Sequence, residues 1–247
     1  MKQKLFLDTG IEKISAKCKV EEKKTTSIKT THYIVTKEER KNIKRKEGDY
    51  IVMQFPYEAL HTKKNSLTKE LERILKLFLK KYPKSNKVLV VGLGNKDVDG
   101  DALGVYTTDK LIATNQYIDF LTIPKVALFN PSVTEKTGIN SFKLISMVVE
   151  DIKPNLLIMI DALATNNEEY LNNAMEINDT GIIPGSAINA AKEINGSTFG
   201  IPVLSIGVPC TLEQNKKFYT SVLIHEVLEN SSTIIADAIN NIFMKST

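Results

Sequence analysis

The sequence predicts an α/β fold: a three-layer sandwich around a mainly parallel sheet, preceded by an N-terminal α+β extension. From residue 87 onward, uninterrupted apolar strands alternate with helical segments. Strands that are apolar throughout are typical of a parallel sheet covered by helices on both faces. Before residue 87, short runs of β-branched and aromatic residues precede one amphipathic helix. We therefore expect an extension over residues 1–86 and an α/β domain over residues 87–247.

The extension contains two predicted strands and one predicted helix. Residues 28–35 and 50–55 are rich in β-branched and aromatic residues, as strands are. Apolar residues recur at helical spacing over residues 67–81, which predicts a helix that ends before Tyr82-Pro83. The charged stretch 37–46 suits an exposed connection.

The α/β domain follows a regular order of elements. Predicted strands cover residues 87–92, 126–129, 155–160 and 202–206, and predicted helices cover residues 103–114, 140–152 and 222–244. In open α/β sheets, ligands bind beyond the carboxyl ends of the strands. The loops that follow these strands are therefore the first places to look for a site.

Composition excludes several protein classes. Hydrophobic residues make up 42% and charged residues 25% of the 247 residues, which is an ordinary globular balance. No apolar run reaches the ~18 residues of a membrane helix, and the apolar run near Met1 is too short for a secretory signal. The two cysteines, Cys18 and Cys210, form no CxxC motif. We expect a cytoplasmic protein.

Charge is uneven along the chain. Residues 1–87 hold 23 Lys and Arg against 11 Asp and Glu, whereas residues 88–247 hold 10 against 18. This basic N-terminal part, which we call the basic front, can attract nucleic acid or an acidic protein. Only three of the basic residues are arginines, the side chain that base readout and phosphate clamps favour. We therefore interpret the front as a lysine-rich surface and expect neither a nucleic acid nor a membrane as partner.

The loop after the first domain strand, residues 92–104, concentrates acidic side chains. It lacks the third glycine of a dinucleotide fingerprint, because Asp97 stands there, and it lacks the Gly-Lys-Ser/Thr of a phosphate loop. Asp97, Asp99 and Asp101 lie close together and would attract a cation or a proton instead. Asp101 could equally cap the following helix.

A second carboxylate, Asp161, follows the apolar run 156–160. Asp101 and Asp161 should then meet at the same edge of the sheet. Two carboxylates in a partly buried site share a proton, so that one activates water while the other protonates a leaving group. The pair could also hold a divalent metal, although late transition metals are usually bound by His or Cys as well. The three histidines, His32, His61 and His225, fall outside both loops.

The tripeptide Asp-Thr-Gly occurs at residues 8–10 and 179–181. It marks pepsin-like and retropepsin-like aspartic proteases, but those folds are all-β, unlike residues 87–247. A tripeptide is weak evidence without its fold context. Residues 179–186 form a turn-rich loop that could line a site.

Four ordered blocks resemble the germination protease family of spore-forming bacteria: VLVVGLGNKDVDGDALG (88–104), IDALA (160–164), INDTGIIPGS (177–186) and IPVLSIGVP (201–209). The resemblance implies a cytoplasmic endopeptidase of unusual aspartic type that degrades small acid-soluble spore proteins. Its two essential aspartates match Asp101 and Asp161. The same blocks give Asn95, Asp179, Gly185 and Ser186 as residues that bind substrate or line the site. We also expect a homo-oligomer.

The family is distantly similar to the nickel-dependent peptidases that mature hydrogenases, which also use a histidine ligand. Here Ile183 stands where the family usually has histidine before Pro-Gly-Ser, so we expect no metal and no cofactor. The segment 210–223 is shorter than in the family, and no self-cleavage signal is recognisable near Asp8, so self-processing should be absent or altered. Two alternatives stay open: a metal-dependent hydrolase that uses the same aspartates as ligands, and an inactive relative that binds a partner through the basic front.

Overall fold

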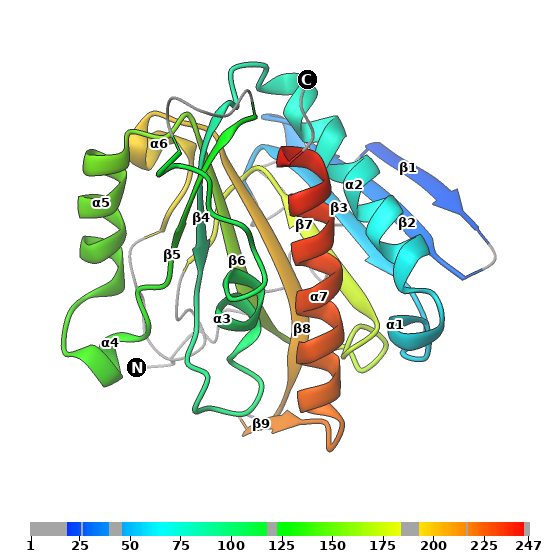
Figure 1. Ribbon diagram of the computed structural model, residues 1–247. Helices are drawn as coiled ribbons and strands as arrows, with labels where there is room; N and C mark the ends of the chain where they lie inside the picture. The colour runs from blue at the N-terminus through cyan, green and yellow to red at the C-terminus, as the bar shows by residue number, and fades with distance from the viewer. Residues whose placement is uncertain are drawn as a thin grey trace.

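The computed structural model describes residues 19–25, 27–39, 46–117, 123–183, 193–215 and 217–244 (Figure 1). The first Asp-Thr-Gly tripeptide and two predicted site residues, Gly185 and Ser186, lie outside these ranges. Within the described residues, no helix has the length and apolarity needed to span a membrane.

A nine-stranded sheet forms the centre of the described structure. Its main path runs β1-β2-β3-β7-β8-β6-β4-β5, and β9 pairs with β8 beside that path. The strands are β1 (Lys19–Lys24), β2 (Lys29–Val35), β3 (Gly48–Gln54), β4 (Lys87–Gly92), β5 (Lys125–Phe129), β6 (Leu156–Thr165), β7 (Ala174–Asn178), β8 (Val203–Gln214) and β9 (Lys217–Thr220).

The sheet as a whole is mixed, with parallel pairs in one part and antiparallel pairs in another. The pairs β4–β5, β4–β6 and β6–β8 are parallel, as predicted for the apolar strands. The strands β1, β2, β3 and β7 are joined in antiparallel pairs, and β7 and β9 pair antiparallel with β8. Within residues 87–247 the parallel pairs predominate, which confirms the prediction, and the antiparallel strands of the extension add to the same sheet through β7.

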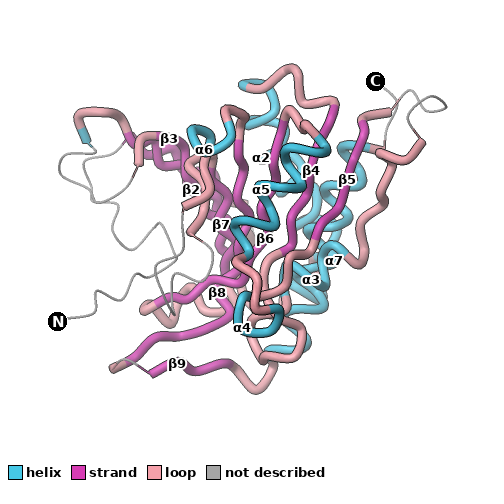
Figure 2. The backbone as a smooth tube through the Cα atoms, turned by 90° about the vertical axis from the view of Figure 1, so that its left-hand side faces the viewer, coloured by secondary structure: helices cyan, strands magenta, loops and turns pink. Residues whose placement is uncertain are grey.

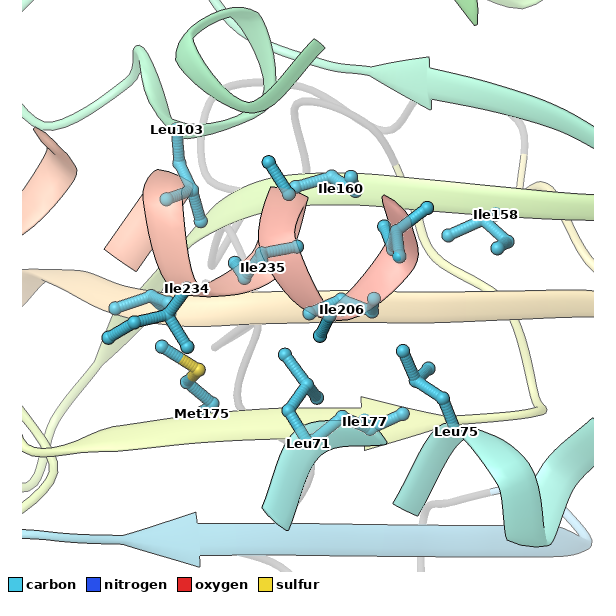
Figure 3. Packing of buried hydrophobic residues seen from close by; sticks show 14 of the residues in the cluster. Leu71, Leu75, Leu103, Ile158, Ile160, Met175, Ile177, Ile206, Ile234 and Ile235 are labelled. Carbon is cyan, nitrogen blue, oxygen red and sulfur yellow. The ribbon is translucent and has the colours of Figure 1, made fainter. Parts of the chain in front are cut away.

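Helices cover both faces of the sheet, which confirms the α/β class. Along β4, Val88 and Val90 belong to one buried cluster and Leu89 and Val91 to another, as alternation on a strand requires. The first cluster packs under α2, α3 and α7, and Figure 3 shows α2 and α7 residues over β6, β8 and β7. The second packs under α5 and α6. The helices are α1 (Ala59–Thr62), α2 (Lys64–Lys81), α3 (Leu103–Thr108), α4 (Thr134–Thr137), α5 (Ser141–Ile152), α6 (Gly196–Phe199) and α7 (Ile224–Phe243).

Two parallel strands run further than the sequence predicts. β6 continues through Asp161 to Thr165, and β8 continues through Gly207 to Gln214. The two strands stay paired beyond Asp161↔Gly207, with a register shift at Leu163/Ala164. Asp161 therefore lies within a strand, not just past its end. Conversely, α3 ends at Thr108 instead of 114, and the strands β1, β7 and β9 were not predicted.

Candidate active site

The loop that carries Asp101 is tied to the strand that carries Asp161. The backbone N–H of Leu93 donates to the carbonyl of Ile160 at 2.8 Å, directly before Asp161. Gly104 packs against the same carbonyl so closely that an added Cβ would lie 2.5 Å from the oxygen. Glycine at 104 therefore permits the close approach of α3 to β6. Asp101, the aspartate of the block GxxxxxxDALG, therefore lies in a loop that is held against Ile160, the residue directly before Asp161.

The three acids of the loop have different partners. Asp97 forms an ion pair with Lys136, which lowers the pKa of its exposed carboxyl. Asp99 lies 3.4 Å from His225, and both side chains are exposed. Asp101 instead turns inward, where its Oδ2 accepts a hydrogen bond from the backbone N–H of Asn95 at 2.9 Å. Of the three acids, Asp97 and Asp99 are exposed and Asp101 is half-buried.

Asp101 does not cap α3. The residue at the N-cap position is Ala102, which makes no side-chain cap, and the Asp101 carboxylate binds Asn95 instead. Burial raises the pKa of Asp101 to about 6, the Asn95 N–H opposes this rise, and the charge of Glu135 adds to it. In the described part of the chain, no Lys, Arg or His forms an ion pair with Asp101. Near neutral pH this carboxyl can therefore gain or lose a proton.

Asp161 is half-buried in β6, at the level of Gly207 in β8. Its Oδ1 accepts a hydrogen bond from the backbone N–H of Ala162 at 2.9 Å. Because side chains on a strand alternate, Asp161 shares its sheet face with Met159 and lies on the opposite face from Ile160.

The Cys210 thiol connects the two aspartates. Cys210 is fully buried in β8, and its pKa is raised first by burial and then by the charges of Asp161 and Asp101. Charge effects of this kind need short separations in a protein interior. Both aspartates therefore lie within charge-interaction range of Cys210, and that they form one catalytic pair stays a prediction.

Asn95 contacts Asp101 directly. Its backbone N–H donates to both the carboxylate and the carbonyl oxygen of Asp101, and its side-chain Oδ1 accepts from the N–H of Asp97 at 3.1 Å. Asn95 therefore shapes the loop and holds Asp101.

Asp179 lies elsewhere in the fold. It follows β7, where Asn178 pairs with Ser205, and β8 reaches the level of Asp161 only at Gly207. That register separates Asp179 from Asp161 by about 10 Å along the strands. The Asp179 carboxylate accepts from Lys81, Tyr82 and the backbone N–H of Asp49. That Asp179 lines the site stays a prediction.

Glu176 is a buried acid that the sequence did not single out. It is 3% exposed in β7 and pairs with Gly207, which on its other side pairs with Asp161. Asp161 and Glu176 therefore flank a glycine on the same sheet face. Two residue pairs away, toward the start of β8, Ser205 is buried and its hydroxyl has no hydrogen-bond partner among the described residues. The available signal was an acid between two apolar residues, Met175 and Ile177.

The described residues contain no group of three or more His, Cys, Asp and Glu side chains placed to hold a metal ion. His225 approaches the acidic loop, but its neighbour there is Asp99 on the surface. The arrangement that remains is a half-buried carboxyl with a raised pKa, in a loop hydrogen-bonded to the strand of a second carboxylate. Such a carboxyl can exchange a proton with a bound water.

Comparison with known proteins relates these features to one family. A sequence profile of the family described as germination protease matches residues 6–239. The chain is 35% identical over 207 residues to the germination protease of Geobacillus sp. (strain WCH70), covering 78% of this chain and 55% of that protein. It is 34% identical over 209 residues to that of Oceanobacillus iheyensis, with the same coverages. The chain thus spans about half the length of the curated relatives it matches.

A solved structure also aligns with the chain. It is the NiFe hydrogenase maturation protease HycI from Thermococcus kodakarensis KOD1, with a TM-score of 0.42 and 19% identity, covering 66% of this chain and 99% of that one.

Proposed function

The chain belongs to the germination protease family, and from that premise we propose that it is an endopeptidase in which Asp101 and Asp161 activate water for attack on a peptide carbonyl. The observation that carries this proposal is the state of Asp101: a half-buried carboxyl, without an ion-pair partner in the described residues, whose pKa is raised to about 6. Perturbed acids of this kind concentrate at catalytic sites.

The roles of the two aspartates follow from their surroundings. Asp101 is the proton donor, because burial favours its neutral form. Asp161 is the base: it takes a proton from water while the water oxygen bonds to the peptide carbon. Asp101 gives its proton to the carbonyl oxygen, which yields a neutral tetrahedral intermediate. When the C–N bond breaks, Asp161 passes its proton to the departing nitrogen and Asp101 recovers a proton from the hydroxyl.

The substrate that we propose is a small acid-soluble spore protein or a similar small protein in the cytoplasm. The family relationship supports this choice. An unstructured protein suits the site, because a peptide bond must reach Asp101 within a loop that is fixed to β6 through Leu93 and Gly104.

The test incubates purified protein with a small acid-soluble spore protein and with casein as an unstructured control, each with and without EDTA. We expect cleavage that EDTA does not change. Asp101→Asn and Asp161→Asn should each lower kcat by several orders of magnitude, and the double variant should lower it little further, because residues that act as one unit are not additive. Cleavage that persists in Asp161→Asn contradicts the mechanism, and loss of activity in EDTA favours a metal-dependent hydrolase.

A further inference from the structure

Exposed apolar side chains gather beside the loop that carries Asp101. Eleven large hydrophobic residues are exposed in the described part of the chain, and five of them lie in two neighbouring segments. One segment is the acidic loop, and the other is β9 with the turn that follows it. We call these five residues the β9 surface: Val98 (49% exposed), Phe218 (44%), Tyr219 (48%), Val222 (98%) and Leu223 (42%).

The two segments touch next to the candidate catalytic residues. An added Cβ on Gly100 would lie 2.7 Å from the Thr220 side chain and 3.2 Å from that of Thr211, so the acidic loop rests on the β8–β9 hairpin. His225, at the start of α7, lies 3.4 Å from Asp99. The end of β9 at Thr220 is therefore in contact with the residue directly before Asp101.

β9 is an edge strand with an unusual composition. Its register with β8 runs from Thr211↔Thr220 to Gln214↔Lys217, and it pairs with no other strand among the described residues. All four residues of β9 are exposed. Figure 2 shows β9 running beside β8. Proteins usually protect an edge with charges. β1, the edge strand at the far end of the sheet, follows this rule with the sequence KVEEKK, whereas β9 reads KFYT.

We propose that β9 binds the substrate polypeptide as an added strand and guides it toward Asp101 and Asp161. This inference rests on the proposed endopeptidase function. Strand addition uses main-chain hydrogen bonds, which any sequence supplies, and side-chain contacts on alternate faces. Phe218 and Tyr219 point to opposite faces of β9, so they contact an added strand from both sides.

The size of β9 favours a peptide over a second copy of the chain. Four residues span about 13 Å, whereas a stable dimer buries roughly 800 Å² on each partner. The surface also includes Val98, three residues before Asp101 in the same loop, so it lies beside the proposed catalytic residue.

Binding can be measured without cleavage in the Asp161→Asn background. The probe is fluorescein-labelled, reduced and carboxymethylated α-lactalbumin, which stays unfolded, and the readout is fluorescence anisotropy. Adding Phe218→Ser and Tyr219→Ser should raise Kd about tenfold, because exposed aromatic residues dominate such contacts. The matched control adds Ile139→Ser and Met147→Ser, which remove hydrophobic residues that are 48% and 57% exposed elsewhere on the surface. Its Kd should stay within about twofold, as expected for residues outside an interface.

Two further measurements separate the mechanisms. A labelled decapeptide from the same protein should lose binding when alternate backbone nitrogens are methylated, because strand addition needs those donors. In the protein with both aspartates intact, Phe218→Ser/Tyr219→Ser should raise KM for a polypeptide about tenfold and leave kcat unchanged, the signature of lost uniform binding.

The outcomes distinguish this inference from the proposed function. Cleavage by the wild type with unchanged Kd and KM in the Phe218/Tyr219 variant overturns docking on β9 and keeps the endopeptidase. Binding that depends on β9 without any cleavage supports the docking surface and contradicts the endopeptidase. A change of oligomeric state in light scattering, with peptide binding unaltered, shows that a second copy occupies β9 and overturns the inference.

Discussion

Two pairs of acids lie at opposite ends of the sheet, and they are stabilised in opposite ways. In Figure 1, the C-terminal end of α2, with Lys81, is at the top, and the loops after the parallel strands are at the bottom. At the top, Asp179 accepts hydrogen bonds from Lys81 at 3.0 Å and Tyr82 at 3.1 Å, and Asp49 binds Lys81 and His32. At the bottom, the Asp101 carboxylate accepts from the backbone N–H of Asn95 and pairs with no cation among the described residues.

The difference separates a structural role from a chemical one. The carboxylate of Asp179 has a cation and a phenol as partners, and its charge helps raise the pKa of Tyr82 to about 12, second to burial. At Asp101 no cation offsets the effect of burial, and the pKa of its carboxyl rises to about 6. An acid that is neutralised by its neighbours holds elements together, while a buried acid that is not neutralised binds a proton.

The largest expected effect is on activity. Asp101→Asn should lower kcat by at least about a thousandfold, because it removes one half of a coupled pair. Asp179→Asn is the matched exchange at the other end of the sheet, and there we expect kcat within about threefold of wild type, since truncation outside the reacting groups changes little. Steady-state kinetics on one unstructured substrate measures both. An equal loss in the two variants would put Asp179 into the catalytic site.

The next effect is the pH dependence of kcat/KM. Asp101 must be protonated to donate, so activity should fall as pH rises through about 6, the pKa of its carboxyl. The fall should approach tenfold per pH unit. A second, acidic limb should appear where the base becomes protonated. The two apparent pKa values belong to the coupled pair and not to either aspartate alone. A profile that keeps rising to pH 8 would rule out Asp101 as the donor.

A smaller effect concerns stability. The pKa of Asp101 is about 6 in the folded chain and 3.8 in a model peptide. The destabilisation from ionising Asp101 is therefore absent below pH 3.8, grows between pH 3.8 and 6, and is constant above pH 6. By linkage, wild type should lose about 2 kcal/mol relative to Asp101→Asn between pH 4 and pH 8. Urea unfolding of both proteins at the two pH values measures this. Equal differences at both pH values would show that Asp101 titrates normally.

The sequence predicts the elements that are continuous in their apolar pattern. The starts of β4, β6 and β8 come within one residue of prediction, because uninterrupted apolar runs indicate strands buried on both faces. β7 was missed because Glu176 and Asn178 interrupt its five residues. The extension of β6 was missed because an acid after an apolar run resembles a strand end. Pairing with β8 carries the strand past Asp161 all the same.

The sequence selects Asp101 and Asp161 as the catalytic pair, and this stays a prediction. Spacing alone does not explain why Asp101 differs from Asp97 and Asp99 in the same loop. That difference depends on Lys136 and His225, which are distant in sequence and pair with Asp97 and Asp99. Burial of the third acid is a tertiary effect that no local pattern contains.

The smallest expected effect is a shift in the pH dependence of activity caused by the charge of Glu135. Glu135 is exposed in α4, and its charge adds to the rise of the Asp101 pKa. Glu135→Gln should therefore move the alkaline limb of kcat/KM to lower pH, by less than about half a unit, since salt screens exposed charges. The shift should grow when ionic strength is lowered from 0.15 M to 0.01 M, because the screening length rises from about 8 Å to about 30 Å. Glu169→Gln, an exposed acid that does not perturb Asp101, is the control and should leave the limb in place. If Glu135→Gln leaves the alkaline limb of kcat/KM unchanged at both ionic strengths, the titrating group is not Asp101.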